Sequence, residues 1–459
     1  MTVAMETFTV VVFVLSYIGI AFGTVPPLAL DRTGFALLGA IILVAGGSLT
    51  VESAIHAIDT STLLLLYALM VVSAQLRLGG FYTYVALKVA SRVHSPVWFL
   101  LLLMVAVASL SAVLTNDVVC LAFTPVVVAA LLEAKLHPVP FLLGLAMASN
   151  IGSAATIIGN PQNMLIGQVQ KLDFAKFVVF CLPPSVLVLA VAFGILVFLY
   201  RGRWQGTEQL RAAGTTVQGT ARSEQRTSER GAPAATRESL KNSLATTAPQ
   251  TSISETRDAD GPLTEWPPFN LWQTTKGLCA VAGVIVFFFT SVPRELTALT
   301  AAGLLLLSRR MRSRWLLGFV DWHLLTLFCG LFIIIAALTS TGLPDLVVRS
   351  MKAHGVDLHD VNILSGVSVV LSNLVSNVPA TMLLLKFVDP TRPVESYALA
   401  LSSTYAGNLI TLGSIANLIV IEQAGRLGVR IGFWEYARAG VPVTLASLLI
   451  MGVWLALVK

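Results

Sequence analysis

Charged side chains are scarce in this sequence. Its 459 residues include 30 Lys and Arg and 24 Asp and Glu, so only 12% of the chain is charged, against about 25% in soluble domains. Hydrophobic residues make up 56%, and too few polar residues remain to cover a soluble protein of this size. The composition excludes a cytosolic enzyme, a disordered protein and a secreted scaffold. It predicts an all-α polytopic membrane protein.

Cysteine and histidine are also rare, and their spacing excludes further classes of protein. The four cysteines lie far apart in apolar stretches, which indicates neither a disulfide framework nor a CxxC metal site. The six histidines have no metal-ligand spacing, so no metal or other cofactor is expected. Residues 1–7 lack a basic region, so we expect no cleavable signal peptide. No basic stripe with interleaved aromatics is present, which excludes a nucleic-acid partner.

Apolar runs long enough to cross a bilayer occur in two sets of five, separated by a different kind of segment. Residues 201–270 are rich in Ser, Thr, Gly, Ala, Arg and Glu and are predicted to form a disordered linker, because they cannot bury a core. The predicted domains are therefore a first membrane repeat (1–200), the linker (201–270) and a second membrane repeat (271–459). The predicted spans are 8–24, 33–50, 60–77, 141–167, 174–200, 272–290, 295–308, 321–341, 396–420 and 433–457.

The two halves resemble each other at a nearly constant offset. Asp59 and Asp321 each precede a span and lie 262 positions apart, and both are expected to cap helix starts. LSAVLTNDV at 110–118 matches LSNLVSNVP at 371–379, and SNIGSAATIIGNPQN at 149–163 matches GNLITLGSIAN at 407–417. We interpret these matches as a tandem repeat.

Basic residues indicate that the repeat is inverted. Positive loops stay in the cytoplasm, and nine Lys and Arg lie in 201–270 and four Arg in 308–314, whereas the matching first-half loop 46–59 has none. Corresponding loops on opposite sides mean inverted topology with five crossings per half. The chain is thus expected to be a multi-pass protein of the plasma (inner) membrane with a cytoplasmic linker.

Two apolar stretches with polar breaks are predicted to form re-entrant hairpins. Residues 96–134 break at Thr115-Asn116-Asp117, and residues 360–388 break at Ser376-Asn377. A hairpin that returns to its own side keeps the basic flanks of 96–134 together. Between the third span and the first hairpin, segment 80–95 has an aromatic face and is expected to form an amphipathic interfacial helix.

The hairpin tips and the interrupted spans 149–163 and 407–417 are four breaks dense in Asn, Ser, Thr, Gly and Pro. Non-helical backbone at membrane depth is tolerated only where protein or a water-filled cavity satisfies it, and inverted-repeat transporters place substrate at such breaks. The alternative is that these residues only pack helices. The predicted substrate-binding residues are Thr115, Asn116, Asn150, Ser153, Thr156, Asn160, Gln162, Asn163, Ser376, Asn377, Asn408, Thr411, Ser414 and Asn417.

Asp117 is the only acid expected near the bilayer centre, where a carboxylate usually marks an ion or proton pathway. We predict that it is the coupling-ion site. The alternative is a cap that accepts backbone N–H bonds at the hairpin tip. Its repeat partner is Val378, so one coupling site is expected. No Lys or Arg is expected near the breaks, which favours a neutral or weakly charged oxyacid, or an anion carried with cations.

The LTND motif at 114–117 and SNIGSAATIIGNPQNMLIG at 149–167 resemble the ion-transporter superfamily. That group includes arsenite-efflux and silicon-efflux permeases, citrate transporters, divalent-anion:sodium symporters and sodium/proton antiporters. The GNPQN run is most similar to the arsenite and silicon branch. The resemblance implies a scaffold domain and a transport domain, with substrate held between the hairpin tips.

The family's paired hairpin signature corresponds to Thr115-Asn116-Asp117 and Ser376-Asn377-Val378. In the sodium-coupled branch the third position carries a hydroxyl group that helps form the sodium site. Asp117 and Val378 depart from that pattern, which favours coupling to protons.

We therefore predict a secondary active transporter, not an enzyme, for a small anion or weak oxyacid such as arsenite, silicate or a carboxylate. It would work in the lipid bilayer by alternating access, driven by a proton or sodium gradient. The sequence does not decide between a monomer and a homodimer. Alternatives are a sodium/proton antiporter of the same fold, a channel and a membrane-embedded enzyme. An enzyme would need a nucleophile with a base, or a metal set, at the midplane.

Overall fold

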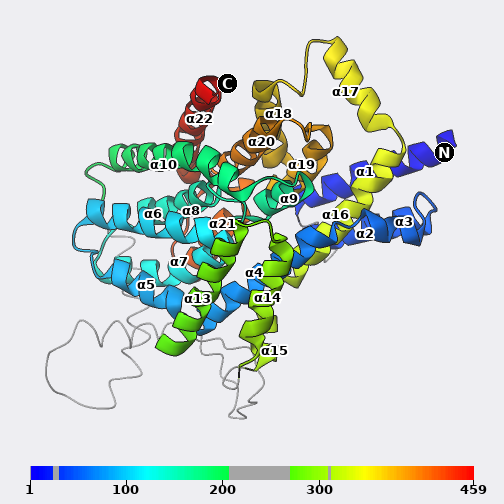
Figure 1. The fold of residues 1–459 in the computed structure, drawn as a ribbon. Helices are drawn as coiled ribbons and strands as arrows, with labels where there is room; N and C mark the ends of the chain where they lie inside the picture. The colour runs from blue at the N-terminus through cyan, green and yellow to red at the C-terminus, as the bar shows by residue number, and fades with distance from the viewer. Residues whose placement is uncertain (1, 24–29, 206–268, 309–311, 459) are drawn as a thin grey trace, which may run out of the picture.

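The computed structural model describes residues 2–23, 30–205, 269–308 and 312–458 (Figure 1). Most of the predicted linker 201–270, and Arg309 and Arg310 of the basic loop, lie outside the described residues. Within the described ranges the elements are helical, apart from one isolated bridge between Leu136 and Gln205. The all-α prediction is confirmed. Eight of these helices are long and apolar enough to cross a membrane.

Ten helices of the described chain precede the linker and ten follow it, in matching order. The spans and breaks predicted from the apolar runs coincide closely with these helices and with the gaps between them. The first half comprises α1 (Val3–Phe22), α2 (Arg32–Ala45), α3 (Val51–Ala57), α4 (Thr60–Leu78), α5 (Phe81–Ala90), α6 (Pro96–Val113), α7 (Asn116–Glu133), α8 (Val139–Ser153), α9 (Pro161–Val169) and α10 (Phe174–Leu199).

The second half repeats this order from α13 to α22, with two short 3₁₀ segments added. It comprises α13 (Leu271–Phe288), α14 (Arg294–Leu306), α15 (Ser313–Gly318), α16 (Trp322–Ser340), α17 (Leu343–Ala353), α18 (Val361–Val375), α19 (Asn377–Leu384), η1 (Leu385–Phe387), α20 (Pro393–Ala406), η2 (Thr411–Gly413), α21 (Ile415–Arg426) and α22 (Phe433–Val458).

Equivalent helices begin and end through the same local chemistry. Asp59 accepts a hydrogen bond from the Thr62 backbone N–H (2.7 Å), and Asp321 accepts one from Leu324 (2.9 Å). Both are N-caps, which satisfy backbone donors that a helix leaves unpaired. Gly80 and Gly342, again 262 positions apart, have φ of 73° and 70° and turn the chain sharply after α4 and α16. The predicted caps are confirmed.

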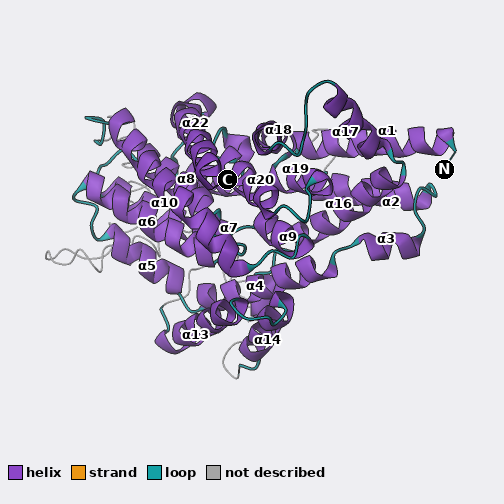
Figure 2. Ribbon diagram, turned by 45° about the horizontal axis from the view of Figure 1, so that its top comes forward, coloured by secondary structure: helices purple, strands orange, loops and turns teal. Residues whose placement is uncertain are grey.

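The halves are interwoven in space. α2 packs against α16 and α4 packs against α14, so the second helix of each half packs against the fourth helix of the other. Figure 2 shows α1 and α2 beside α16 at one end of the molecule, and α13 and α14 beside α4 below. Reciprocal contacts of this kind are those of a two-fold relation. α10 and α22, the last helices of the halves, also pack against each other.

The two hairpins differ in length. α6 and α7 have 18 residues each, about 27 Å at 1.5 Å per residue, close to the roughly 30 Å of a bilayer core. α19 has only 8 residues, or about 12 Å, and cannot cross. Length thus excludes a full crossing for α19, while the re-entrant placement of the first hairpin still depends on the loop charges.

Candidate functional site

The two hairpin tips are sharp breaks between helices. α6 ends at Val113, and Leu114 and Thr115 are extended before α7 begins at Asn116. In the second half Ser376 separates α18 from α19 with φ of 76°. That left-handed conformation is costly for a residue other than glycine and is found mostly where surroundings enforce it.

The first broken span satisfies its own interrupted backbone with asparagine side chains. α8 ends at Ser153 and α9 begins at Pro161, as the break predicted at 149–163 requires. Asn160 caps α9 by accepting the Asn163 N–H (2.8 Å). The Asn163 amide nitrogen donates to the carbonyl oxygens of Ser153 (3.2 Å) and Thr156 (3.0 Å). Unwound backbone is thus stabilised inside the protein, as burial requires.

In the second broken span an asparagine side chain likewise donates hydrogen bonds to the interrupted backbone. The Asn417 amide nitrogen donates to the carbonyl oxygens of Gly407 (2.6 Å) and Ile410 (3.3 Å). These three residues lie 254 positions after Asn163, Ser153 and Thr156. Ser414, the equivalent of Asn160, caps α21 through the Ala416 N–H (3.3 Å). Identical bonding at one offset is strong structural evidence for the repeat.

Each hairpin tip packs against the broken span of its own half. The backbone N–H of Asn116 donates to the Gly159 carbonyl (3.3 Å), and the Ser149 hydroxyl donates to the Asn116 carbonyl (3.3 Å). With its amide oriented to match donors with acceptors, Asn377 donates to the carbonyls of Ser403 (3.2 Å) and Gly413 (3.0 Å). Positions 403 and 413 are again 254 residues after 149 and 159.

Asn150 joins the two broken spans. Its amide nitrogen donates to the Oδ1 atoms of Asn408 (2.9 Å) and Asn417 (3.1 Å), and its own Oδ1 accepts from Ser414 Oγ (2.9 Å). All four side chains are buried. Both ends of one amide thus connect the first half to the second.

Asn160 makes the reciprocal connection. Its amide nitrogen donates to Ser153 Oγ (2.9 Å) in its own half and to Thr404 Oγ1 (3.3 Å) in the other. Thr404 is the equivalent of Asn150, and Ser414 is the equivalent of Asn160. The bonds 150–414 and 160–404 are therefore related by the two-fold repeat.

The remaining predicted site residues lie at the edge of this network. Thr156 donates to the Ala112 carbonyl at the end of α6. Gln162 is buried, while Ser376 and Thr411 are half-buried. Within the described residues, the side chains of these three take part in no hydrogen bond.

Several buried polar atoms of the network have unused hydrogen-bonding capacity. Within the described part of the chain, Thr115 Oγ1, Asn116 Oδ1, Asn163 Oδ1 and Asn408 Nδ2 have no partner. Most buried polar groups in proteins are paired, and an exception calls for an explanation such as a ligand or water. These atoms are two amide oxygens, one hydroxyl group and one amide nitrogen, and together they match the hydrogen-bonding groups of a small polar ligand.

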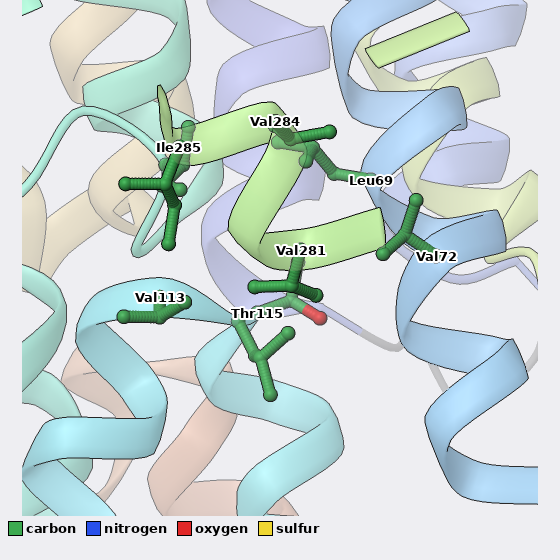
Figure 3. Close-up of a pocket in the computed structure, with 9 residues that line it drawn as sticks. Leu69, Val72, Val113, Thr115, Val281, Val284 and Ile285 are labelled. Atoms are coloured by element: carbon green, nitrogen blue, oxygen red, sulfur yellow. The ribbon is translucent and has the colours of Figure 1, made fainter. Parts of the chain in front are cut away.

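Two pockets border the first hairpin tip at Thr115. One, of about 10 Å³, is apolar and lies between the tip, α4 and α13 (Figure 3). In Figure 3, Val281, Val284 and Ile285 of α13 face Val113 and Thr115 of the hairpin, with Leu69 and Val72 of α4 beside them.

The second pocket, of about 60 Å³, contains Asp117. It is lined by Met70, Ala74, Arg77, Thr115, Asp117, Val118, Pro161, Phe319, Asp321 and Leu324. Asp117 is half-buried, and within the described residues its carboxylate accepts no hydrogen bond. The alternative interpretation of Asp117 as a cap of the hairpin tip therefore finds no support.

Two expectations about charge near the breaks are wrong. Arg77 and Asp321 line the same pocket as Asp117, so the tip is neither free of basic residues nor limited to one acid. Arg77 also stacks over the Phe319 ring, with 4.4 Å from the guanidinium carbon to the ring centroid. The apolar runs place both residues at span ends. The error arises because α4 and α16 bring those ends beside the hairpin tip.

Thr404 and Ser149 also belong to the network but were not among the predicted residues. Their signal is present in the sequence, since aligning the broken spans at the offset of 254 pairs Thr404 with Asn150 and Ser403 with Ser149. Asn373 was missed as well. It donates to the carbonyls of Val369 (3.0 Å) and Ala406 (3.1 Å), so it ties α18 to α20.

These features define a polytopic helical transporter with paired hairpins and broken helices. Residues 11–402 match the CitMHS family, described as Citrate transporter. The chain belongs to this family of membrane transporters and is not an enzyme. The resemblance to ion-transporter permeases predicted from the tip and GNPQN motifs is thereby confirmed.

Individual relatives extend over nearly the whole chain. The "Silicon efflux transporter LSI3" of Oryza sativa subsp. japonica is 30% identical over 92% of this chain and 92% of its own. The "46 kDa membrane protein" of Mycobacterium leprae is 28% identical over 98% of both chains. Among solved structures, the YdaH transporter of Alcanivorax borkumensis covers 99% of this chain and 97% of its own, with a TM-score of 0.46 and 14% identity.

Proposed function

We propose that the protein is a secondary active transporter that moves a small weak oxyacid or anion across the plasma membrane by alternating access, coupled to protons through Asp117. The observation that carries the proposal is the buried network of neutral amides and hydroxyls in which the two broken spans and both hairpin tips meet. Such a set binds a hydroxylated solute through neutral hydrogen bonds. Silicic acid is the first substrate to test, given the silicon efflux transporter among the relatives.

The charges of the neighbouring pocket also favour a weakly charged substrate. Two acidic residues, Asp117 and Asp321, and one basic residue, Arg77, line this pocket. A multiply charged anion would be repelled there, whereas an uncharged acid would not. Carboxylates are acceptors only, so the hydroxyl groups of such an acid match them.

The test is a transport survey in proteoliposomes with imposed proton and sodium gradients. Silicic acid, arsenite, phosphate, sulfate, citrate and succinate are compared as solutes. We expect a proton gradient to drive accumulation of a weak oxyacid without sodium. Accumulation that rises with substrate charge, or that requires sodium, would contradict the proposal.

Asp117→Asn is expected to uncouple transport from the pH gradient, because an amide cannot carry the proton. Downhill flux should persist, while uphill flux driven by the proton gradient should fall at least tenfold. Asp173→Asn is the matched control, since Asp173 only caps α10 by accepting the Lys176 N–H (2.7 Å). Unchanged pH dependence in Asp117→Asn would refute the coupling role.

A sodium/proton antiporter is the second candidate. It is favoured by the two carboxylates and the Thr115 hydroxyl around one pocket, because hard cations prefer oxygen ligands. Arg77 in the same pocket opposes a bound cation. Sodium-driven proton flux in the absence of any transported anion would support this candidate over the first.

A further inference from the structure

The helix α18, the first arm of the second hairpin, turns polar side chains inward and apolar ones outward. Ser365, Ser368 and Ser372 are spaced by three and four positions, so they lie on one face of the helix. Ser368 and Ser372 are completely buried, whereas Val370 and Leu374 on the opposite face are 59% and 60% exposed. In a membrane this arrangement directs the hydroxyl groups away from lipid and toward the interior of the protein.

The helix α18 packs against α19 and α20, and Figures 1 and 2 show these three helices side by side. Near the start of α18 and α20, Nδ1 of His359 lies 3.4 Å from a carboxylate oxygen of Glu395. Near the ends of the same two helices, the Asn373 amide nitrogen donates to the Ala406 carbonyl oxygen (3.1 Å). The serine face lies between these two contacts, along about 10 Å of helix.

All three helices contribute buried hydroxyl groups that have no hydrogen-bond partner. A serine or threonine in a helix can bond to the carbonyl four residues earlier, as Ser365 does with Val361 (2.6 Å). Most buried polar groups are paired, and exceptions indicate a ligand or water. Within the described residues, the unpartnered atoms of this region, each on a residue no more than 1% exposed, are Ser368 Oγ, Ser372 Oγ, Thr381 Oγ1 and Ser396 Oγ.

The first hairpin has no such set of hydroxyl groups. At the offsets of the repeat, Ser368, Thr381 and Ser396 correspond to Val107, Cys120 and Leu142. The fourth position corresponds to Ser111, which is paired with Ser149 (3.1 Å). The fold therefore does not need unpartnered hydroxyl groups at these positions for packing, and they are a property of the second hairpin.

We propose that the space between α18, α19 and α20 is an aqueous pathway from the outer face of the membrane to the tip of the second hairpin. Its hydroxyl groups would hydrogen bond to water and to small hydroxylated solutes. This inference rests on the proposed function and adds the route by which solute reaches the site from outside. The basic loop at 308–314 is expected in the cytoplasm and α16 crosses the membrane after it, so α18 begins at the outer face.

The pathway is closed in this structure, because its hydroxyl groups are buried, and it opens when α18 separates from α20. Separation gives the unpartnered hydroxyl groups water as a partner, which lowers the cost of opening. The buried face of α6 is mostly apolar, so the same movement in the first hairpin would expose apolar surface to water. The second hairpin is therefore the one that admits water.

The decisive experiment measures whether an aqueous thiol reagent reaches this space from outside. Ser368→Cys and Ser372→Cys are made separately in the full-length chain, with the exposed Cys279 and the half-buried Cys329 changed to alanine. A charged methanethiosulfonate that cannot the bilayer cross is applied to intact cells, and mass spectrometry follows the modification of each cysteine. Thiols react as thiolates, which burial in apolar surroundings disfavours, so reaction reports access to water.

Matched positions show what the rates mean. Val107→Cys places a thiol at the equivalent of Ser368 in the first hairpin, and Val370→Cys places one on the exposed apolar face of α18. We expect Ser368→Cys and Ser372→Cys to react at least tenfold faster than either. The native Cys120, the equivalent of Thr381, should stay unmodified in every variant.

A second pair of variants tests the hydroxyl group itself. Ser368→Thr and Ser368→Val add side chains of nearly the same shape, but only threonine keeps the hydroxyl group. Ser368→Thr should take up silicic acid in proteoliposomes at nearly the rate of the unmodified chain, whereas Ser368→Val should be at least fivefold slower. Equal rates for the two variants would contradict the pathway.

The pathway is overturned if neither Ser368→Cys nor Ser372→Cys reacts, if they react only from the cytoplasmic side in inverted vesicles, or if Val107→Cys reacts as fast. Thiol access is measured without substrate. Rapid modification in a chain that transports none of the tested solutes would refute the proposed function alone. Normal transport of silicic acid by a chain in which neither cysteine reacts would refute the pathway alone.

Discussion

At the scale of single residues, Asn150 makes three of the side-chain hydrogen bonds that join the two halves at the candidate site. Asn150 uses both ends of its amide on partners from the second half, Asn408, Asn417 and Ser414. A buried polar group that loses its partner costs about 1–3 kcal/mol. Loss of this one side chain should therefore have a large effect on the free energy of unfolding.

Asn150→Ala should lower the free energy of unfolding by about 2 kcal/mol and abolish transport, because it leaves buried groups of the second half unpaired. Thermal denaturation in detergent and uptake in proteoliposomes measure the two effects. Ser185→Ala is the control, since it breaks another buried bond between the halves, Ser185 to Tyr405 (2.9 Å), outside the network. If both variants transport equally well, Asn150 has no special role.

The polar residues of the breaks could be predicted because Asn, Ser and Thr clusters are conspicuous within apolar spans. Their partners could not all be found in this way. Arg77 and Asp321 lie at span ends, 244 positions apart, and nothing local indicates that they share a pocket with Asp117. Three helices must first pack before that juxtaposition exists.

At the scale of elements, a glycine allows α8 to pack closely against α6. At Gly152 in α8 an added Cβ would meet the backbone of Ala108 in α6. The glycines of 149–163 predict a break in the helix, but Gly152 remains helical and acts through this close approach.

Gly152→Ala should therefore be destabilising by about 1–3 kcal/mol, the usual cost of overpacking. Gly194→Ala in α10 is the matched control, because its Cβ would meet no atom within 4 Å. Replacing glycine in a helix interior then stabilises by about 0.5–1 kcal/mol. Melting curves of the two variants should move in opposite directions, and a common direction would contradict the packing role.

Repeat-related elements need not pack alike. α5, within the segment predicted to be an interfacial helix, packs against α7 and buries Tyr82, Ala86 and Ala90. Its counterpart α17 contacts mainly α16 and leaves Leu346 63% exposed and Val347 51% exposed. Figure 1 shows α17 projecting from the rest of the second half. Sequence periodicity alone does not distinguish these two environments.

At the scale of the whole molecule, the repeats are continuous in sequence but interwoven in space. Element order and the offset near 262 were predictable because apolar runs and polar breaks recur. The pairing of α2 with α16 and of α4 with α14 was not predictable. These helices are apolar on every side, so their sequences do not indicate which face contacts which partner.

This interweaving predicts that the chain can be divided at its linker. Fragments 1–205 and 269–459 expressed together should copurify in equal amounts and transport like the intact chain. Each fragment alone should be degraded or aggregate, since α2 lacks α16 and α14 lacks α4. Affinity purification through a tag on one fragment measures the association. Recovery of a stable, monodisperse 1–205 fragment by itself would contradict the prediction.

The reciprocal helix pairing also bears on the ancestry of the fold. A half-length ancestor would have exposed the face of its second helix that α16 now covers. Given the inverted orientation indicated by the loop charges, only another copy inserted the opposite way up could have covered it. Such a chain must insert in both directions, so its loops should have carried little bias in Lys and Arg. The strong bias at 308–314 and its absence at 46–59 would then have arisen after gene duplication, once each half needed only one orientation.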